Sequence, residues 1–293
     1  MSRMKEVSRM KFHNITSLIL RRQRAVIPAA TLTVSPAQYQ YLQGQRRIRR
    51  QILVCRVLFL VLFLFLWEIS ARIGILNDFI FSSPSRVLSC FLSMTANRTI
   101  FYHMGITILE TLFSFFLVTG IGIFGAVALW SSRRLAKILE PYLVMLNSLP
   151  KSALAPVLIV WLGNNMKTII TAAVSVAVFG SVLTLYNGFL SMDPDQIRLI
   201  YTLGGKRKDV LTKVLLPGSV PLIISNMKVN IGLCLVGVII GEFLSAQAGL
   251  GFLIIYGSQV FKLDLVIMSI VILCILSAIL YQAVAVLEKR CGR

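Results

Sequence analysis

Ionisable side chains within long apolar runs are the residues of this sequence that could carry chemistry. Glu110, Lys151, Lys228 and Glu242 all lie in such runs. Because a charged group is costly to place in an apolar environment, each is a candidate for a functional site or an internal ion pair. Glu110 lies early in its run, where it could line a solute path or simply reach water. Glu242 could cap the end of its helix or gate a pore, together with a predicted turn at Gly249-Leu250-Gly251.

Two further groups of polar residues interrupt apolar runs. In Asn147-Ser148-Leu149-Pro150-Lys151, Pro150 and the later Pro156 are expected to break or kink a helix and to turn carbonyl groups toward a cavity. Lys151 could instead extend to the membrane interface. Asn147, Ser148, Pro150 and, in a later run, Asn226 are therefore candidates for a translocation path.

The fifth apolar run also carries a lysine and a pair of glycines. Lys228 is expected to reach the interface or to pair with an acid rather than to contact a solute. Gly237 and Gly241 are four residues apart, a spacing that predicts a surface for close helix packing.

Enzyme and metal chemistry have no support in the sequence. The two histidines, His13 and His103, have no evident partner, and none of the five cysteines forms a CxxC pair. The sequence contains no G-x-x-x-x-G-K-[ST] loop, so we expect ATP to be hydrolysed by another polypeptide. The net charge of +19 could suggest nucleic acid, but the basic residues flank apolar runs, which favours membrane topology and anionic lipid.

The composition predicts an all-α polytopic membrane protein. Hydrophobic residues make up 57% of the 293 residues and charged residues 14%. The apolar residues gather in blocks near the ~20 residues that span a bilayer, and without the alternation of a β-barrel. Six transmembrane helices are predicted: Ile52–Trp67, Ile106–Trp130, Pro141–Leu162, Thr168–Leu190, Val220–Gly241 and Leu265–Leu287.

The basic residues predict the orientation of these helices, because cytoplasmic loops are enriched in Lys and Arg. They concentrate before the first span, after the second and fourth spans, and in the tail. Both termini are therefore expected in the cytoplasm. Residues 1–51 form a separate basic extension, either poorly ordered, which we favour, or with a surface helix over residues 10–27. Residues 52–293 form the transmembrane domain.

The loop between the fourth and fifth spans, residues 192–217, is a charged insertion with the pattern of a helix-turn-helix. Asp193-Pro194 is typical of a helix start. Gly204-Gly205 is expected to break that helix, and a second helix is predicted over Lys206–Leu216, which includes Asp209. Pro217 and Pro221 are expected to end the unit and to start the next span. Ile197, Ile200 and Leu203, and then Val210, Leu211, Val214 and Leu215, recur on apolar faces.

This loop resembles the coupling loop of bacterial ABC-importer permeases. Gly204, Leu216 and Pro217 match the family spacing, and Asp193-Pro194 and the segment from Gly241 to Phe252 match its sulfonate/taurine/nitrate branch. The similarity runs from about Ser82 to about Leu287. One departure concerns the Glu-Ala-Ala triplet of the family, which is replaced by Arg198-Leu199-Ile200. It implies either a weakened coupling element or an ATPase with an altered groove.

The resemblance implies a function and partners. It implies a permease dimer, homomeric or heteromeric, in the bacterial inner membrane, two cytoplasmic ATPase subunits that bind the ATP, and an extracytoplasmic substrate-binding protein. The expected solute is a small anion such as a sulfonate, or a vitamin precursor, and no cofactor is expected in this chain. An ATP-independent transporter or channel, and a membrane scaffold that no longer transports, are the alternatives.

Overall fold

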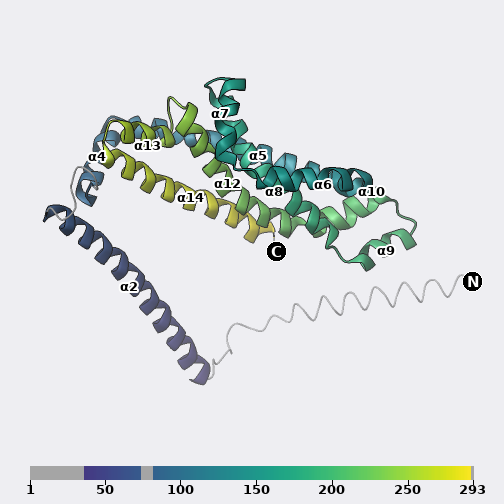
Figure 1. Cartoon of the computed structure of the whole chain (residues 1–293). Coiled ribbons are helices and arrows are strands. Elements are labelled where there is room, and N and C mark those ends of the chain that lie inside the picture. The colour runs from purple at the N-terminus through teal and green to yellow at the C-terminus, as the bar shows by residue number, and fades with distance from the viewer. Residues whose placement is uncertain (1–35, 74–81, 292–293) are drawn as a thin grey trace, which may run out of the picture. The chain divides into compact units, whose positions relative to one another are not determined.

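The computed structural model describes residues 36–73 and 82–291, and within these ranges the regular structure is helical, with no strand (Figure 1). The chain divides into two units at Phe63 and Leu64, inside helix α2 (Pro36–Arg72). Helical backbone therefore extends into the last part of the predicted basic extension. The surface helix predicted over residues 10–27 lies outside the described residues, and the boundary between the two predicted domains stays a prediction.

Among the described residues, five helices are long and apolar enough to cross a membrane, as predicted for all but the third segment. They begin or end up to several residues from the predicted positions; the second starts before Ile106 because Arg98, in a left-handed conformation at φ 58°, precedes its first turn. The five are residues Gln51–Arg72 of α2, α5 (Thr99–Ser131), α8 (Met166–Leu190), α12 (Val220–Ser245) and α14 (Leu263–Cys291).

The third predicted span is not one straight helix. It consists of α6 (Arg133–Ser148) and α7 (Lys151–Leu162), bent by 97° at Leu149-Pro150. Pro150 has no N–H to donate and its ring disfavours a helical residue before it, so the break predicted there is confirmed. Lys151 Nζ donates to the Asn147 carbonyl oxygen at this break, and its reach to a membrane interface stays a prediction. The break or kink also predicted at Pro156 does not end the helix there, because α7 continues through Pro156 to Leu162.

Helix α8 packs against both α5 and α12, and these three helices lie side by side in Figure 1. Gly237 and Gly241 form the close contact between α12 and α8, as predicted. A Cβ atom at Gly237 would lie 2.6 Å from Ala173 Cα, and one at Gly241 would lie 3.0 Å from Ile169 Cα. Small residues therefore let the two backbones approach closely.

Two short helices were not predicted. Helix α4 (Pro84–Ala96) follows Ser83, and α13 (Leu250–Gln259) follows Gly249, whose φ of 117° suits glycine alone. The predicted turn is therefore wrong beyond Gly249, because Leu250 and Gly251 are already in α13. In Figure 1, α4 and α13 lie at one end of the second unit, and both pack against α14.

The loop after α8 forms the predicted elbow at the other end of this unit (Figure 1). We use "elbow" for residues 192–217. Its first limb is α9 (Pro194–Thr202). Its second limb is α10 (Arg207–Val210), a π-helical turn (Leu211–Leu215) and α11 (Leu216–Gly218).

Pro217 lies in α11, which ends at Gly218, and Pro221 lies in the first turn of α12, so the two prolines stand at the end of the elbow and the start of the next span, as predicted. The π turn closes a bond from the Leu216 N–H to the Leu211 carbonyl oxygen. This wider turn shifts the carbonyl groups just before Pro217, whose ring clashes with normal α-helical register.

Candidate functional site

The first limb of the elbow begins as its sequence predicts. Asp193 precedes α9, and its Oδ1 atom accepts a hydrogen bond from the Asp195 N–H at 2.9 Å. Pro194 occupies the first helical position, where no N–H is needed. A side-chain cap and a proline thus fix the point at which the chain turns away from α8.

The turn between the limbs depends on two glycines. Gly204 has a φ of 82°, in the left-handed region that favours glycine. A Cβ atom at Gly205 would lie 2.5 Å from Ile200 Cγ2 and 2.8 Å from the Ile200 carbonyl oxygen. The first glycine therefore supplies the backbone conformation, and the second lets the turn close against the first limb.

Asp209 lies in the first turn of the second limb. Its Oδ2 atom accepts from the Lys206 N–H at 2.8 Å, and its Oδ1 atom lies 3.1 Å from Lys213 Nζ. These contacts, the Lys206 N–H first and Lys213 second, lower the pKa of Asp209. The carboxylate is thus charged at neutral pH and holds the first turn of α10.

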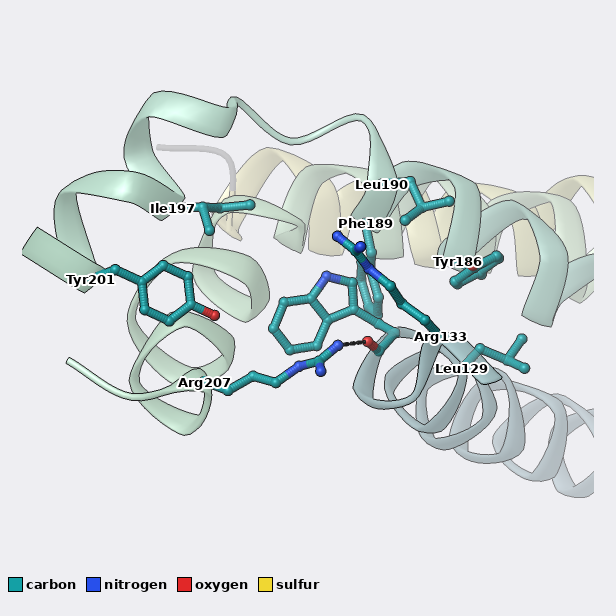
Figure 2. A pocket seen from close by; sticks show the side chains of 9 residues that line it. Leu129, Arg133, Tyr186, Phe189, Leu190, Ile197, Tyr201 and Arg207 are labelled. Atoms are coloured by element: carbon teal, nitrogen blue, oxygen red, sulfur yellow. Dashed lines mark hydrogen bonds between the residues drawn. The ribbon is translucent and has the colours of Figure 1, made fainter. Parts of the chain in front are cut away.

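The second limb is anchored to the membrane-spanning helices. Leu215 is fully buried in a cluster with Leu129 of α5 and Phe189 of α8. Arg207 Nη2 donates to the Trp130 carbonyl oxygen at 2.5 Å, and its guanidinium carbon lies 4.9 Å from the centroid of the Trp130 ring (Figure 2). Force on this limb therefore acts on the ends of α5 and α8.

The first limb presents apolar side chains to solvent. Leu203 is 75% exposed and Leu199 58%. Of the apolar positions predicted to share one face, Ile197 and Ile200 are half-buried, so Leu203 alone is outward-facing. Arg198 pairs with Asp195 at 3.2 Å, an exposed contact that contributes little.

A second polar cluster lies at the start of α13. Side chains of α5 and α12 accept hydrogen bonds from three backbone N–H groups at the start of α13. The Gly249 N–H donates to His103 Nδ1 (3.1 Å), the Leu250 N–H to Thr107 Oγ1 (2.9 Å) and the Gly251 N–H to Glu242 Oε2 (2.5 Å). Helix starts leave such donors without partners inside the helix, so this cluster caps α13.

Glu242 therefore caps α13 rather than the end of its own helix. It is 1% exposed, and its Oε1 atom accepts from the Thr107 hydroxyl at 2.7 Å. Glu110 lies against Glu242 and is 2% exposed, so the interpretation that it simply reaches water is wrong. Its Oε2 atom has no hydrogen-bond partner among the described residues.

The structure brings some predicted residues together and separates others. Glu110 and Glu242 are neighbours. Asn147, Ser148 and Pro150 lie together at the exposed break between α6 and α7. They are on different helices from Glu110 and Glu242, which belong to α5 and α12. Asn226 is buried and donates from Nδ2 to Ser181 Oγ at 2.7 Å, so it joins α12 to α8.

Several residues of these sites were missed by the sequence reasoning. His103 and Thr107 share a helical face with Glu110, and that spacing could have linked them to one site. Lys228 pairs with Glu288 of α14, which agrees with the prediction that it would either reach the interface or pair with an acid. Trp130 and Arg207 carry no signal of their contact, because they are far apart in the sequence.

Comparison with known proteins decides the family. A family model described as the binding-protein-dependent transport system inner membrane component matches residues 118–293. The chain belongs to this family. The permease is 27% identical over 238 residues to a probable ABC transporter permease protein of Haemophilus influenzae, with 81% of this chain and 94% of that protein covered.

Two further comparisons agree. The permease is 23% identical over 225 residues to the putative aliphatic sulfonates transport permease protein SsuC of Bacillus subtilis, covering 77% of this chain and 82% of that one. A chain of the MetNI methionine ABC transporter, solved in inward-facing conformations, has a TM-score of 0.57 at 19% identity, covering 64% of this chain and 94% of that one. That similarity shows a shared fold.

The chain is thus a multi-pass membrane permease subunit of an ABC importer for a small solute, and not an enzyme. Its family implies a separate ATPase subunit and a substrate-binding protein as partners. The alternatives of a secondary transporter and a non-transporting scaffold receive no support from these relatives.

Proposed function

We propose that the elbow is the docking site of the ATPase and transmits its motion to the spans. The observation that supports this most is the contrast between its two limbs. The second limb is anchored on α5 and α8 through Leu215 and Arg207, whereas the first exposes Leu199 and Leu203 outside the apolar helices. Exposed apolar side chains of this kind mark interaction surfaces.

The departure from the family triplet fits this role with an adapted partner. Leu199 stands where the family has a small residue, and its side chain is exposed rather than packed on the permease. We propose that the ATPase has a groove wide enough for the Leu199 side chain. The contact then buries more apolar area than a small residue at this position would bury. The positive charge of Arg198 adjoins the same surface.

The orientation that this requires follows from the basic residues. We propose that both termini and the elbow face the cytoplasm, because Lys and Arg concentrate on that side of the spans. The elbow is then on the side of the membrane where ATP is present. The cap of α13, with Glu242 and Glu110, then lies at the extracytoplasmic end. The substrate-binding protein would deliver its solute at that end.

We propose that two permeases, identical or different, enclose the path. The described part of one chain has five helices long and apolar enough to span a membrane and one bent pair, and the bent pair exposes the polar residues Asn147 and Ser148 beside Pro150. In a dimer this break would line the path, and Glu110 would add an acid at its outer part. The buried bond of Asn226 to Ser181 gives that residue a role in holding α8 and α12 along the path.

The proposed solute is small, either an anion such as a sulfonate or a vitamin precursor. The first choice is supported by the similarity to SsuC, which is named for aliphatic sulfonates. The binding protein is expected to set the specificity, so its bound ligand identifies the solute.

Purification of the tagged permease from its native membranes, followed by mass spectrometry, tests this proposal. An ATPase subunit and a binding protein should come with the wild-type chain. Gly204→Val should lose the ATPase, because a branched residue is strained at a φ of 82°. Gly120→Val makes the same change on an open face of α5 and should keep it. Recovery of the wild-type chain alone would contradict the proposal.

A further inference from the structure

A cavity of about 360 Å³ lies where the elbow meets the ends of the spans. Figure 2 shows the side chains of Arg133 and Arg207 both extending into this space. None of the lining residues is acidic; they are Leu129, Trp130, Arg133, Tyr186, Phe189, Leu190, Ile197, Tyr201 and Arg207. The cavity is therefore positively charged, with apolar and aromatic walls.

The two guanidinium groups have donors to spare. Arg207 uses one N–H for the Trp130 carbonyl oxygen and lies over the Trp130 ring, which fixes its position. Arg133 has no ion-pair partner in residues 36–73 and 82–291. Each guanidinium has five N–H donors in a planar fork, the arrangement that suits a phosphate group.

The acids of the elbow do not neutralise this charge. Asp193 accepts from the Asp195 N–H, Asp195 pairs with Arg198, and Asp209 binds the Lys206 N–H and Lys213. No ion pair joins Arg133 or Arg207 to an acid of the described residues, so both positive charges can bind an anion. The place of this basic pair at the ends of α5 and α8 is within reach of both a lipid headgroup and a solute in water.

We propose that this cavity binds a phosphate group, held between Arg133 and Arg207. The group could belong to an anionic lipid or to a free phosphate. Since Arg133 begins α6 and Arg207 begins the second limb, the bound phosphate would tie the elbow to the break-containing span. Binding itself does not depend on transport, whereas an effect on ATP hydrolysis rests on the proposed function.

Fluorescence of Trp130 tests the binding step directly. The full chain has three tryptophans, so Trp67→Phe and Trp161→Phe leave Trp130, which contacts Arg207, as the reporter. The chain is titrated with inorganic phosphate in neutral detergent. It is also placed in vesicles of phosphatidylcholine, with and without phosphatidylglycerol. A saturable change with phosphate indicates a free phosphate, and a change only with phosphatidylglycerol indicates a lipid; both support the site.

Three variants make the test specific. Arg133→Gln should weaken the response at least about tenfold, because a charge-assisted pair with the phosphate is lost. The change removes no hydrogen bond or ion pair among the described residues. Arg207→Gln should do the same, and Arg134→Gln, on the adjacent exposed residue, should leave it unchanged. No saturable response to either probe, or one that Arg133→Gln retains, would overturn the site. If phosphate binds but does not change the rate of ATP hydrolysis by the complex, the binding site is supported and only its role in coupling is contradicted.

Discussion

At the scale of single residues, the cap of α13 shows how a buried acid is made tolerable. Glu242 lies in an apolar helix, yet both of its carboxyl oxygens accept hydrogen bonds, from the Thr107 hydroxyl and the Gly251 N–H. Gly249 and Gly251 are needed there, because a Cβ atom at either would collide with the Glu242 side chain. The cluster therefore joins α5, α12 and α13 at one point.

Thr107→Val is expected to destabilise the permease by about 1–3 kcal/mol. The hydroxyl donates to Glu242 and accepts from the Leu250 N–H, so a methyl group leaves the Leu250 N–H without this partner and removes one of the hydrogen bonds of the Glu242 carboxyl group. Thermal unfolding of the detergent-solubilised chain measures the change. Thr171→Val removes an exposed hydroxyl bonded only to its own helix and is the control. Equal midpoints for the two variants would show that the cap contributes no stability.

The lowered pKa of Asp209 predicts that the structure of the elbow depends only weakly on pH under mildly acidic conditions. Because its folded-state pKa lies below the usual 3.8, its contribution is fully present above that value and is lost as the pH falls through the lowered pKa. The first turn of α10 should therefore stay intact between pH 7 and about pH 5. A carboxyl ¹³C titration measures this pKa, and Lys213→Gln should raise it. An Asp209 that titrates at or above 3.8 in the wild type would contradict the capping geometry.

At the scale of elements, the close contact of α8 and α12 holds together two helices of the second unit. Gly237→Ala is expected to cost about 1–3 kcal/mol by overpacking, because its Cβ atom would meet the backbone of Ala173. Gly232→Ala, in the same helix, has nothing within 4 Å of the new atom and should be neutral or stabilising. Unfolding midpoints of the two variants decide the question. A Gly232→Ala protein as unstable as Gly237→Ala would remove the packing argument.

The elements also show what periodicity can and cannot predict. Apolar runs located the spans, and Gly204-Gly205 and Asp193-Pro194 located the elbow, because these signals are local. The short helix α13 was missed since its start depends on side chains from α5 and α12, far away in the sequence. The contact of Arg207 with Trp130 was missed for the same reason.

The third span shows the limit of a composition argument. Pro150 predicted a break, but the residue types do not determine a bend of 97°, which depends on how α6 and α7 pack against α8. The burial of Glu110 was likewise out of reach. An acid near the end of an apolar run is compatible with water, and only the packing of α12 against α5 places it beside Glu242.

At the scale of the whole molecule, one limb of the elbow is attached to the membrane-spanning helices and the other presents exposed apolar side chains. The second limb of the elbow is fixed to α5 and α8, and the first limb exposes Leu199 and Leu203. Such an arrangement transmits a partner's motion into the spans without loss in a flexible loop. The central claim is that this partner is the ATPase.

Site-specific photocrosslinking in native membranes tests that claim most directly. A photoreactive amino acid replaces Leu203, which is 75% exposed on the elbow, or Phe124, which is 77% exposed on the apolar surface of α5. We predict a crosslink to the ATPase subunit from position 203 and none from position 124. If position 203 forms no crosslink to an ATPase that co-purifies with the permease, the elbow is not its docking site.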